Sequence, residues 1–350
     1  MVCFRQSFFL VLLALVMLFT GPAAASLAPP SQTWPQAGSQ PLAITPDPIV
    51  QAMINQVQSS ILYHYVAGLS GEQAVTIGGI PVTLYTRSTK AETYIETATQ
   101  YVYEHFQDLG LVTSYHIWQY SGEPRSNVVA EQPGSDENCI YLLTAHLDDT
   151  SPTYTTRAPG ADDNASGVAG VLMAADILSH YQFTCTLRYV LFTGEEQGLL
   201  GSEAYAEDAA QRGDPILGVL NLDMIAYNTP NSPATIEMDI RSGQAGYQDR
   251  VLSRMVSDVI LAYQIDLIPL VYASSDAGSD QFSFWAEGFP AVEVIEDWDD
   301  HTPHYHELTD TVSTLNMPYF TDYVKAIVGA FAHLGRVTSG YNVSLPVVNQ

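Results

Sequence analysis

The stretch CTLRYVLFTGEEQGLLGS, from Cys185 to Ser202, places two adjacent glutamates at the end of an apolar run. Residues 187–193 predict a buried strand, and residues 199–210 predict a helix. Adjacent carboxylates at the end of a buried strand repel each other and lose hydration. We therefore expect a positive group close to Glu195 and Glu196.

The composition favours a large folded domain. The chain has 350 residues, of which 47% are hydrophobic and 14% charged, so it can bury a substantial core. Its formal net charge is -26, with 12 Lys and Arg against 38 Asp and Glu. Nucleic acids and anionic membranes bind basic surfaces, so this balance argues against both as partners.

The N-terminus has the layout of a secretory signal peptide over residues 1–25. Arg5 precedes an apolar run from Phe8 to Phe19, and small residues follow up to Ala25, where we expect cleavage. Residues 26–48 are rich in Pro, Ser, Gln and Ala and predict a linker or short pro-segment. We expect a folded domain over 49–338, a C-terminal tail over 339–350, and a secreted protein, extracellular or periplasmic, without a membrane anchor.

Beyond residue 126, predicted strands alternate with predicted helices. This alternation predicts an α/β fold with three α/β/α layers around a mostly parallel central sheet. The expected strands span 127–131, 139–145, 187–193, 216–222, 265–271 and 291–295. The expected helices span 49–65, 90–109, 165–181, 199–210, 246–263, 282–288 and 317–334.

Two cysteines remain after removal of the signal peptide. Cys139 and Cys185 each stand directly before a predicted core strand. If those strands are neighbours, the two sulfurs can form a disulfide in an oxidising compartment. The alternative is two separate thiols near the surface.

Carboxylates and imidazoles follow each predicted core strand. Because ligands bind beyond the carboxyl ends of the strands in such a sheet, we expect these loops to converge. Asp, Glu and His together form the ligand set of a divalent metal, with zinc the leading candidate, and a bridging carboxylate suits a two-metal hydrolytic site. The loops contribute His146, Asp148, Asp149, Asp162, Asp163, Glu195, Glu196, Asp223, and the acidic and histidine-rich residues from Glu296 to His306.

Five ordered segments resemble those of a known family. AHLDD, GADDNASG, TGEEQGLLGS, NLDM and YHELTDT look like the motifs of the secreted di-zinc aminopeptidases, the bacterial leucyl aminopeptidase type within peptidase clan MH. Relatives in that clan include glutamate carboxypeptidase II and glutaminyl cyclase. The resemblance covers residues 49–334 and includes TRST, SNVVAEQPG and SDQFSFWAEGFPAV. It implies the zinc exopeptidase-like fold, with the metal site at the carboxyl ends of the strands.

The resemblance also implies a ligand set for two Zn²⁺ ions. His146 and Asp223 would be the terminal ligands of one ion, and Glu196 and His306 those of the other. Asp163 would bridge the two. Asp162 is an alternative bridge, and His301 or His304 could replace His306, although only His306 has the family's spacing to the following TDT.

Two further roles follow from the same resemblance. Glu195 would be the general base that moves a proton from the attacking water to the leaving amine. Asp148 would accept the second N–H of His146 and fix its tautomer. The peptide bond between Asp163 and Asn164 would be cis, as tends to occur in the family.

One residue departs from the family pattern. Many relatives have Ser-Asp-His where this chain has Gln281, so the role of that histidine is absent or replaced. We expect a substrate pocket near Met224, Phe284 and Trp298 that favours bulky apolar side chains.

The leading interpretation is a monomeric, secreted zinc aminopeptidase that acts on the N-termini of peptides. A clan relative with a different specificity, such as a carboxypeptidase or a glutaminyl cyclase, is the second. A non-catalytic, ectodomain-like binding protein is the third, since receptor-like relatives of this fold have lost metal ligands. No such loss is seen here.

Overall fold

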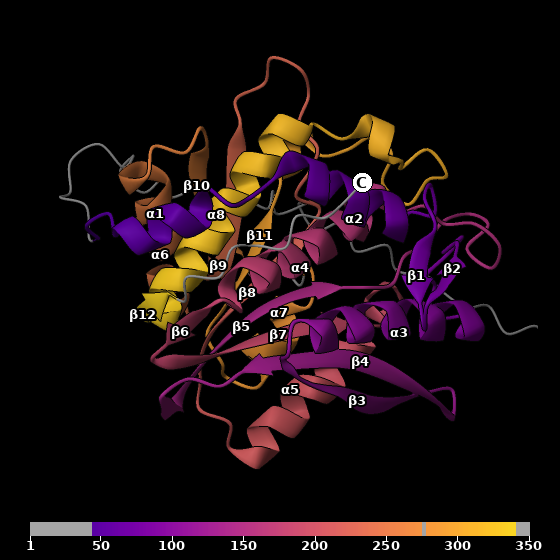
Figure 1. Cartoon of the computed structure of the whole chain (residues 1–350), viewed down its shortest axis with the longest axis horizontal. Helices are drawn as coiled ribbons and strands as arrows, with labels where there is room; N and C mark the ends of the chain where they lie inside the picture. Colours follow the sequence, from indigo (N-terminus) through magenta and orange to yellow (C-terminus); the bar gives the residue numbers. More distant parts are fainter. Residues whose placement is uncertain (1–43, 275–277, 341–350) are drawn as a thin grey trace, which may run out of the picture. The chain divides into compact units, whose positions relative to one another are not determined.

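The computed structural model describes residues 44–274 and 278–340 (Figure 1). The expected signal peptide and most of the expected linker and tail lie outside these residues. Among the described helices, none has the length and apolar character needed to span a membrane.

An eight-stranded sheet forms the centre of the domain, with strand order β10-β9-β11-β8-β5-β7-β4-β3. Strands β11, β8, β5 and β7 are adjacent and parallel, whereas β9 pairs antiparallel with β11, and β4 antiparallel with β7. The strands of this sheet are β3 (Val112–Tyr120), β4 (Glu123–Gln132), β5 (Asp136–His146), β7 (Cys185–Phe192), β8 (Ile216–Asp223), β9 (Thr235–Arg241), β10 (Ile268–Ser274) and β11 (Ala291–Ile295). Two small sheets pair β1 (Val75–Ile77) with β2 (Ile80–Val82) and β6 (Tyr181–Phe183) with β12 (Val337–Gly340).

Helices cover both faces of the sheet. Alternate residues of the central strands enter different apolar clusters: on β5, Leu143 packs in the larger cluster and Leu142 in the smaller. The larger cluster includes residues of α1, α2, α3, α4, α6 and α8, and the smaller includes residues of α5 and α7. The expected three-layer α/β/α fold is therefore confirmed. The helices are α1 (Pro48–Ile54), α2 (Ser59–Leu69), α3 (Glu92–Asp108), α4 (Gly167–Leu178), α5 (Leu200–Arg212), α6 (Tyr247–Ala262), α7 (Gln281–Ala286) and α8 (Met317–Gly335).

The structure differs from the sequence prediction in several places. The helix expected over 49–65 is two helices, α1 and α2, because the chain leaves the helical conformation near Asn55 and Gln58 begins the next helix. Strands β3 and β9 were not predicted. β3 has one buried side chain, Trp118, so it lacks the apolar periodicity of a core strand.

The two remaining cysteines form a disulfide. Cys139 and Cys185 are bonded, with their Cα atoms 4.8 Å apart. The bond joins the amino-terminal parts of the neighbouring parallel strands β5 and β7. It therefore lies at the end of these strands opposite to the loops that carry the carboxylates and histidines.

Candidate metal centre

The sheet topology brings five side chains to one edge. His146 and Asp223 are the last residues of the parallel strands β5 and β8. Asp163 lies in a short π-helical segment, Ala161–Ser166, before α4. Glu196 lies in a 3-10 turn, Glu195–Gln197, after β7, and His306 lies in the loop after β11. Carboxyl ends of parallel strands share one edge, so these residues meet there.

The turn with the two glutamates depends on a close approach of backbone atoms. A Cβ on Gly201 would lie 2.0 Å from the carbonyl oxygen of Thr193. Only glycine therefore lets α5 begin directly against the end of β7. This packing holds Glu195 and Glu196 over the sheet edge.

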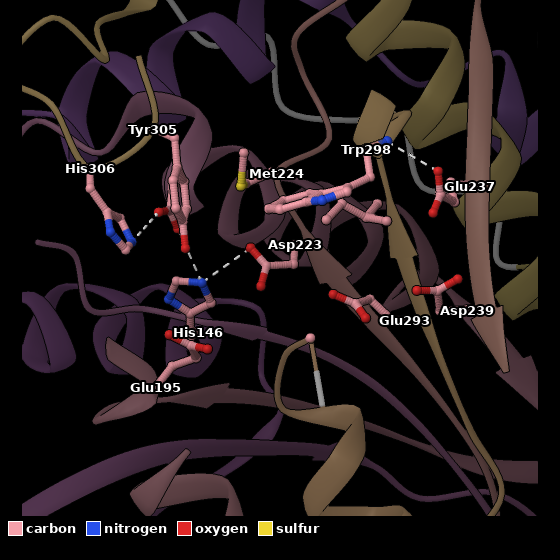
Figure 2. Close-up of a pocket in the computed structure, with 13 residues that line it drawn as sticks. His146, Glu195, Asp223, Met224, Glu237, Asp239, Glu293, Trp298, Tyr305 and His306 are labelled. Carbon is pink, nitrogen blue, oxygen red and sulfur yellow. Dashed lines mark hydrogen bonds and ion pairs between the residues drawn. The ribbon is translucent and has the colours of Figure 1, made fainter. Parts of the chain in front are cut away.

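The five side chains form two triads that share Asp163. Figure 2 labels three of the five, His146, Asp223 and His306. Nε2 of His146 lies 3.3 Å from Oδ1 of Asp163 and 3.2 Å from Oδ1 of Asp223. Nε2 of His306 lies 3.2 Å from Oδ2 of Asp163 and 3.1 Å from Oε2 of Glu196. Asp163 thus presents one carboxylate oxygen to each triad.

These residues fit a pair of divalent metal ions. Two ligand atoms of a tetrahedral zinc ion, each about 2.0–2.1 Å from the metal, are separated by about 3.3 Å, which matches the spacing within each triad. Oε1 of Glu196 is also buried without a hydrogen-bond partner. A buried carboxylate oxygen needs a partner, and a cation supplies one.

The electrostatics of the second triad also suit a cation. Burial raises the pKa of Glu196 to about 8. Burial opposes the charged form of His306, but hydrogen bonds to Asp163 and Glu196 outweigh it and raise the pKa of His306 to about 10. The carboxylates thus attract positive charge at this point, and a bound metal ion would supply it while the imidazole is neutral.

Glu195 lies beside the two triads and belongs to neither. It lines the same cavity as His146 and Asp223. Burial raises the pKa of the Glu195 carboxyl well above its ordinary value. Glu195 is thus a buried carboxyl group next to the cluster, free of the contacts that hold the five triad residues.

Asp148 lies in this site but contacts different atoms from those expected. Nδ1 of His146 is 3.1 Å from the backbone carbonyl oxygen of Asp148 and 3.9 Å from its carboxylate. A carbonyl oxygen only accepts, so the imidazole donates to the backbone. The Asp148 carboxylate instead accepts from the N–H of Glu195 at 3.2 Å and from Oγ1 of Thr89 at 3.1 Å.

The residues that the sequence left open as alternative ligands, Asp162, His301 and His304, make contacts outside the two triads. The carboxylate of Asp162 accepts a hydrogen bond from the N–H of Ala226 at 2.9 Å. The ring of His301 stacks on Trp298, and the ring of His304 lies 2.9 Å from Oγ1 of Thr309. The geometry places Asp163 and His306 in the cluster. The peptide bond between Asp163 and Asn164 is cis, as expected.

A buried arginine supports the loops beneath the site. Arg87, in the TRST segment, forms an ion pair with Asp149 at 3.2 Å, and both side chains are fully buried. Its guanidinium also donates to the backbone carbonyl oxygens of Leu147 and Gly160. Arg87 therefore ties the loop after β5 to the segment that leads to Asp163.

A cavity of about 370 Å³ extends from the triads towards β9 and β11 (Figure 2). Three carboxylates that sequence reasoning did not assign line its far end: Glu237, Asp239 and Glu293. Met224 and Trp298 line it as expected, but Phe284 is fully buried in the smaller apolar cluster and does not.

Comparison with known proteins identifies the family. Residues 127–330 match the model described as Peptidase family M28. This match covers more than half of the chain and all five side chains of the triads. The chain belongs to peptidase family M28.

The M28 chain is also similar to fungal relatives. It is 32% identical over 226 residues to "Leucine aminopeptidase 1" of Arthroderma otae, and this alignment covers 60% of this chain and 58% of the relative. Alignments to several of its fungal relatives likewise span 58% of their length.

Solved structures share the fold of the M28 chain. The LapA aminopeptidase of Legionella pneumophila aligns with a TM-score of 0.69 and 20% identity, over 85% of this chain and 77% of that one. BSAP, a zinc aminopeptidase from Bacillus subtilis, aligns with a TM-score of 0.52 and 21% identity, over 64% of this chain and 53% of that one. At these identities the likeness concerns the fold.

Proposed function

We propose that this M28 chain is a secreted aminopeptidase that binds two Zn²⁺ ions and hydrolyses N-terminal residues from peptides. The observation that carries the proposal is the position of Asp163, which offers one oxygen to each of two triads. His146 and Asp223 would complete one metal site, and Glu196 and His306 the other. Imidazole and carboxylate donors without cysteine suit catalytic zinc.

The chemistry divides between the metals and Glu195. When bound, the ions would acidify the attacking water and polarise the scissile carbonyl. Glu195 would accept the proton of that water and donate it to the leaving amine. Glu195 lines the cavity beside both triads, and its N–H donates to the Asp148 carboxylate, which fixes its backbone position.

The charge of the cavity supports action at an amino terminus. Six carboxylates line the cavity, and none of its lining residues in the described part of the chain is lysine or arginine. A free α-ammonium group complements such a surface. A carboxypeptidase would instead need cationic groups for the substrate carboxylate. The proposal of export rests on the residues before Ala25 and on the acidic, disulfide-bonded domain.

The test measures metal content and N-terminal cleavage together. The full-length protein is assayed with leucyl- and lysyl-nitroanilide, with their N-acetylated forms, and with an N-terminal glutamine peptide, before and after chelation. We expect two zinc ions per chain, cleavage of the free-amine substrates only, and recovery with added Zn²⁺. Cleavage of the acetylated forms, or cyclisation of glutamine without hydrolysis, would contradict an aminopeptidase.

A matched pair of variants tests the general base. Glu195→Gln keeps the shape of the side chain but cannot accept a proton, so we expect kcat to fall by at least about 100-fold. Glu207→Gln, an exposed position on α5, is the control. Equal activity of Glu195→Gln and Glu207→Gln would remove Glu195 from the mechanism.

A further inference from the structure

The far end of the cavity carries an unusual group of carboxylates. Glu237 and Asp239 on β9 and Glu293 on β11 line the same cavity as the two triads. In Figure 2 they lie on the opposite side of Asp223 from His306. We call Glu237, Asp239 and Glu293 the acidic end of the cavity.

Strand register fixes these side chains on one face of the sheet. Glu293 is the direct antiparallel partner of Asp239, and Ile295 is the partner of Glu237. The residues between them, including Met238 and Val294, face the apolar core on the other side. Like charges directly opposite each other on neighbouring strands are destabilising. The sheet therefore holds the acidic end in place against its own repulsion.

Glu237 and Glu293 are buried, Asp239 is partly buried, and none of the three has a counterion among the described residues. Glu293 is 4% exposed and Glu237 is 7% exposed. Oδ1 of Asp239 is inaccessible and has no hydrogen-bond partner. None of the ion pairs within residues 44–274 and 278–340 includes a member of the acidic end; Arg241, on the same strand, pairs with Asp249 at 2.8 Å. Buried charges without a partner are costly, so a cationic ligand would relieve this cost.

Neighbouring groups orient two of the three carboxylates. Nε2 of Gln281 donates to Oε2 of Glu293 at 2.7 Å, and the N–H of Trp298 donates to Oε2 of Glu237 at 3.1 Å. A Cβ on Gly278 would lie 2.4 Å from Oε2 of Glu293, so a larger residue there would displace the Glu293 carboxylate. Each glutamate has one oxygen held by the protein. Gln281, the departure from the family pattern, thus serves the acidic end.

The shape of the cavity favours an elongated cation over a metal ion. Among the described residues, the groups with ligand atoms within 4.8 Å of one another are the two triads, and the acidic end is not one of them. Met224, Ile295 and Trp298 also line the cavity. Figure 2 shows Met224 and Trp298 between His306 and the acidic end. Long basic side chains pack their aliphatic stems on apolar surfaces and place their charge at a polar end. An indole also attracts cations.

We propose that Glu237, Asp239 and Glu293 bind the cationic side chain of an N-terminal lysine or arginine, so that this enzyme selects basic N-terminal residues. This inference rests on the proposed aminopeptidase function. The scissile carbonyl would lie at the triads, and the substrate side chain would extend past Met224 and Trp298 to the acidic end. The sequence led us to expect a preference for bulky apolar N-terminal residues. The proposal replaces it with a preference for N-terminal residues that have a long aliphatic side chain ending in a positive charge.

The test compares substrates of matched shape. The full-length, zinc-loaded protein is assayed with nitroanilides of lysine and norleucine, and of arginine and citrulline. Each pair has a similar stem and differs in charge. We expect kcat/KM for the charged member to exceed that for the neutral member by at least about tenfold. Equal rates, or a faster neutral member, would overturn the basic specificity while leaving the aminopeptidase intact. Cleavage of no substrate would instead contradict the proposed function.

Variants assign the specificity to named residues. We expect Glu237→Gln, Asp239→Asn and Glu293→Gln each to lower the ratio of lysine to norleucine hydrolysis. The ratio is taken within one preparation, so a smaller folded fraction cancels. Glu207→Gln is the control and should retain the ratio. If the three variants slow both substrates equally, the acidic end binds the α-ammonium group and the proposal is wrong. If one Ca²⁺ ion bound per chain and inhibited hydrolysis of the lysine nitroanilide, the acidic end would be a metal site instead.

Discussion

The backbone N–H of Glu195 donates a hydrogen bond of 3.2 Å to the carboxylate of Asp148. The other carboxylate oxygen accepts from Oγ1 of Thr89 at 3.1 Å. Asp148 therefore links the turn that carries Glu195 to the segment before α3. A residue expected to orient His146 through its side chain instead orients the proposed general base.

Substitution of Asp148 should separate these two roles. We expect Asp148→Asn to lower kcat by about 10- to 100-fold, because a neutral amide holds the turn less firmly. Zinc content should remain two ions per chain, measured by metal analysis. If the variant lost zinc as well as activity, the side chain of Asp148 would act by orienting His146, and the prediction would be wrong. Asp108→Asn, at the exposed end of α3, is the control.

The selectivity for basic substrates should rise with pH. Burial raises the pKa of Glu237 to about 7 and that of Asp239 to about 6. Both carboxyls are neutral below these values and charged above them, and a cationic side chain binds the charged form. The ratio of lysine to norleucine hydrolysis should therefore increase between pH 5 and pH 8. Burial also raises the pKa of Glu293, the third member of the acidic end, well above its ordinary value. The other ionisable groups that act on the acidic end are Asp223, Tyr272, Asp297 and Asp299.

The ratio of lysine to norleucine hydrolysis reports on the ionisation of Glu237 and Asp239. Both substrates are cleaved with the same metals and the same base, so pH effects on those groups cancel in the ratio. In Glu237→Gln the remaining pH dependence should follow the lower pKa of Asp239. A ratio that is flat from pH 5 to pH 8 in the unmodified protein would contradict the prediction.

Removal of the metal ions should destabilise the fold. The triads place three buried carboxylates around two imidazoles, and a ligand bound only by the folded state raises stability. We expect chelation to lower Tm by several degrees in calorimetry, with recovery after Zn²⁺ is added. An unchanged Tm after confirmed loss of zinc would exclude a stabilising role for the ions.

Loss of the Arg87 side chain should also destabilise the fold. Arg87→Met leaves the fully buried carboxylate of Asp149 without its cation. Breaking a buried pair in this way costs about 3–5 kcal/mol, which urea unfolding of the metal-loaded protein would measure. Arg254→Met, at a half-exposed pair with Asp258, is the control and should cost less than about 1 kcal/mol.

The disulfide should affect stability without affecting catalysis. Cys139 and Cys185 are 46 residues apart in sequence, and closure of such a loop stabilises a fold by about 4 kcal/mol in the chain-entropy model. We expect Cys139→Ser with Cys185→Ser to lower the free energy of unfolding by about 2–4 kcal/mol. Because the bond lies at the far ends of β5 and β7, kcat should stay within about twofold. A large loss of kcat in a fully folded sample of the variant would show that the disulfide does affect catalysis and would contradict the prediction.

The sequence predicted the core of the fold because its central strands are short apolar runs that end in polar loops. His146, Asp163, Glu196, Asp223 and His306 could each be named because the segments that carry them match the motifs of the family that the sequence resembles, and the structure brings all five together. The hydrogen bonds of Asp148 could not be read from the chain, since its backbone and side chain are equally close to His146 in sequence.

The acidic end was missed because β9 was missed. In TIEMDIR the apolar residues Ile236, Met238 and Ile240 alternate with Glu237 and Asp239. This alternation is the signal of a strand with one polar face. The polar face would ordinarily point to solvent, and only the pairing with β11 shows that it lines a cavity.

The five triad residues come from five separate segments of the chain, spread from His146 to His306. A chain still under synthesis cannot assemble both triads before residue 306 has joined the sheet edge. The proposed peptidase would therefore be unable to cleave other proteins in the cell until almost the whole domain has been made, even without an inhibitory segment.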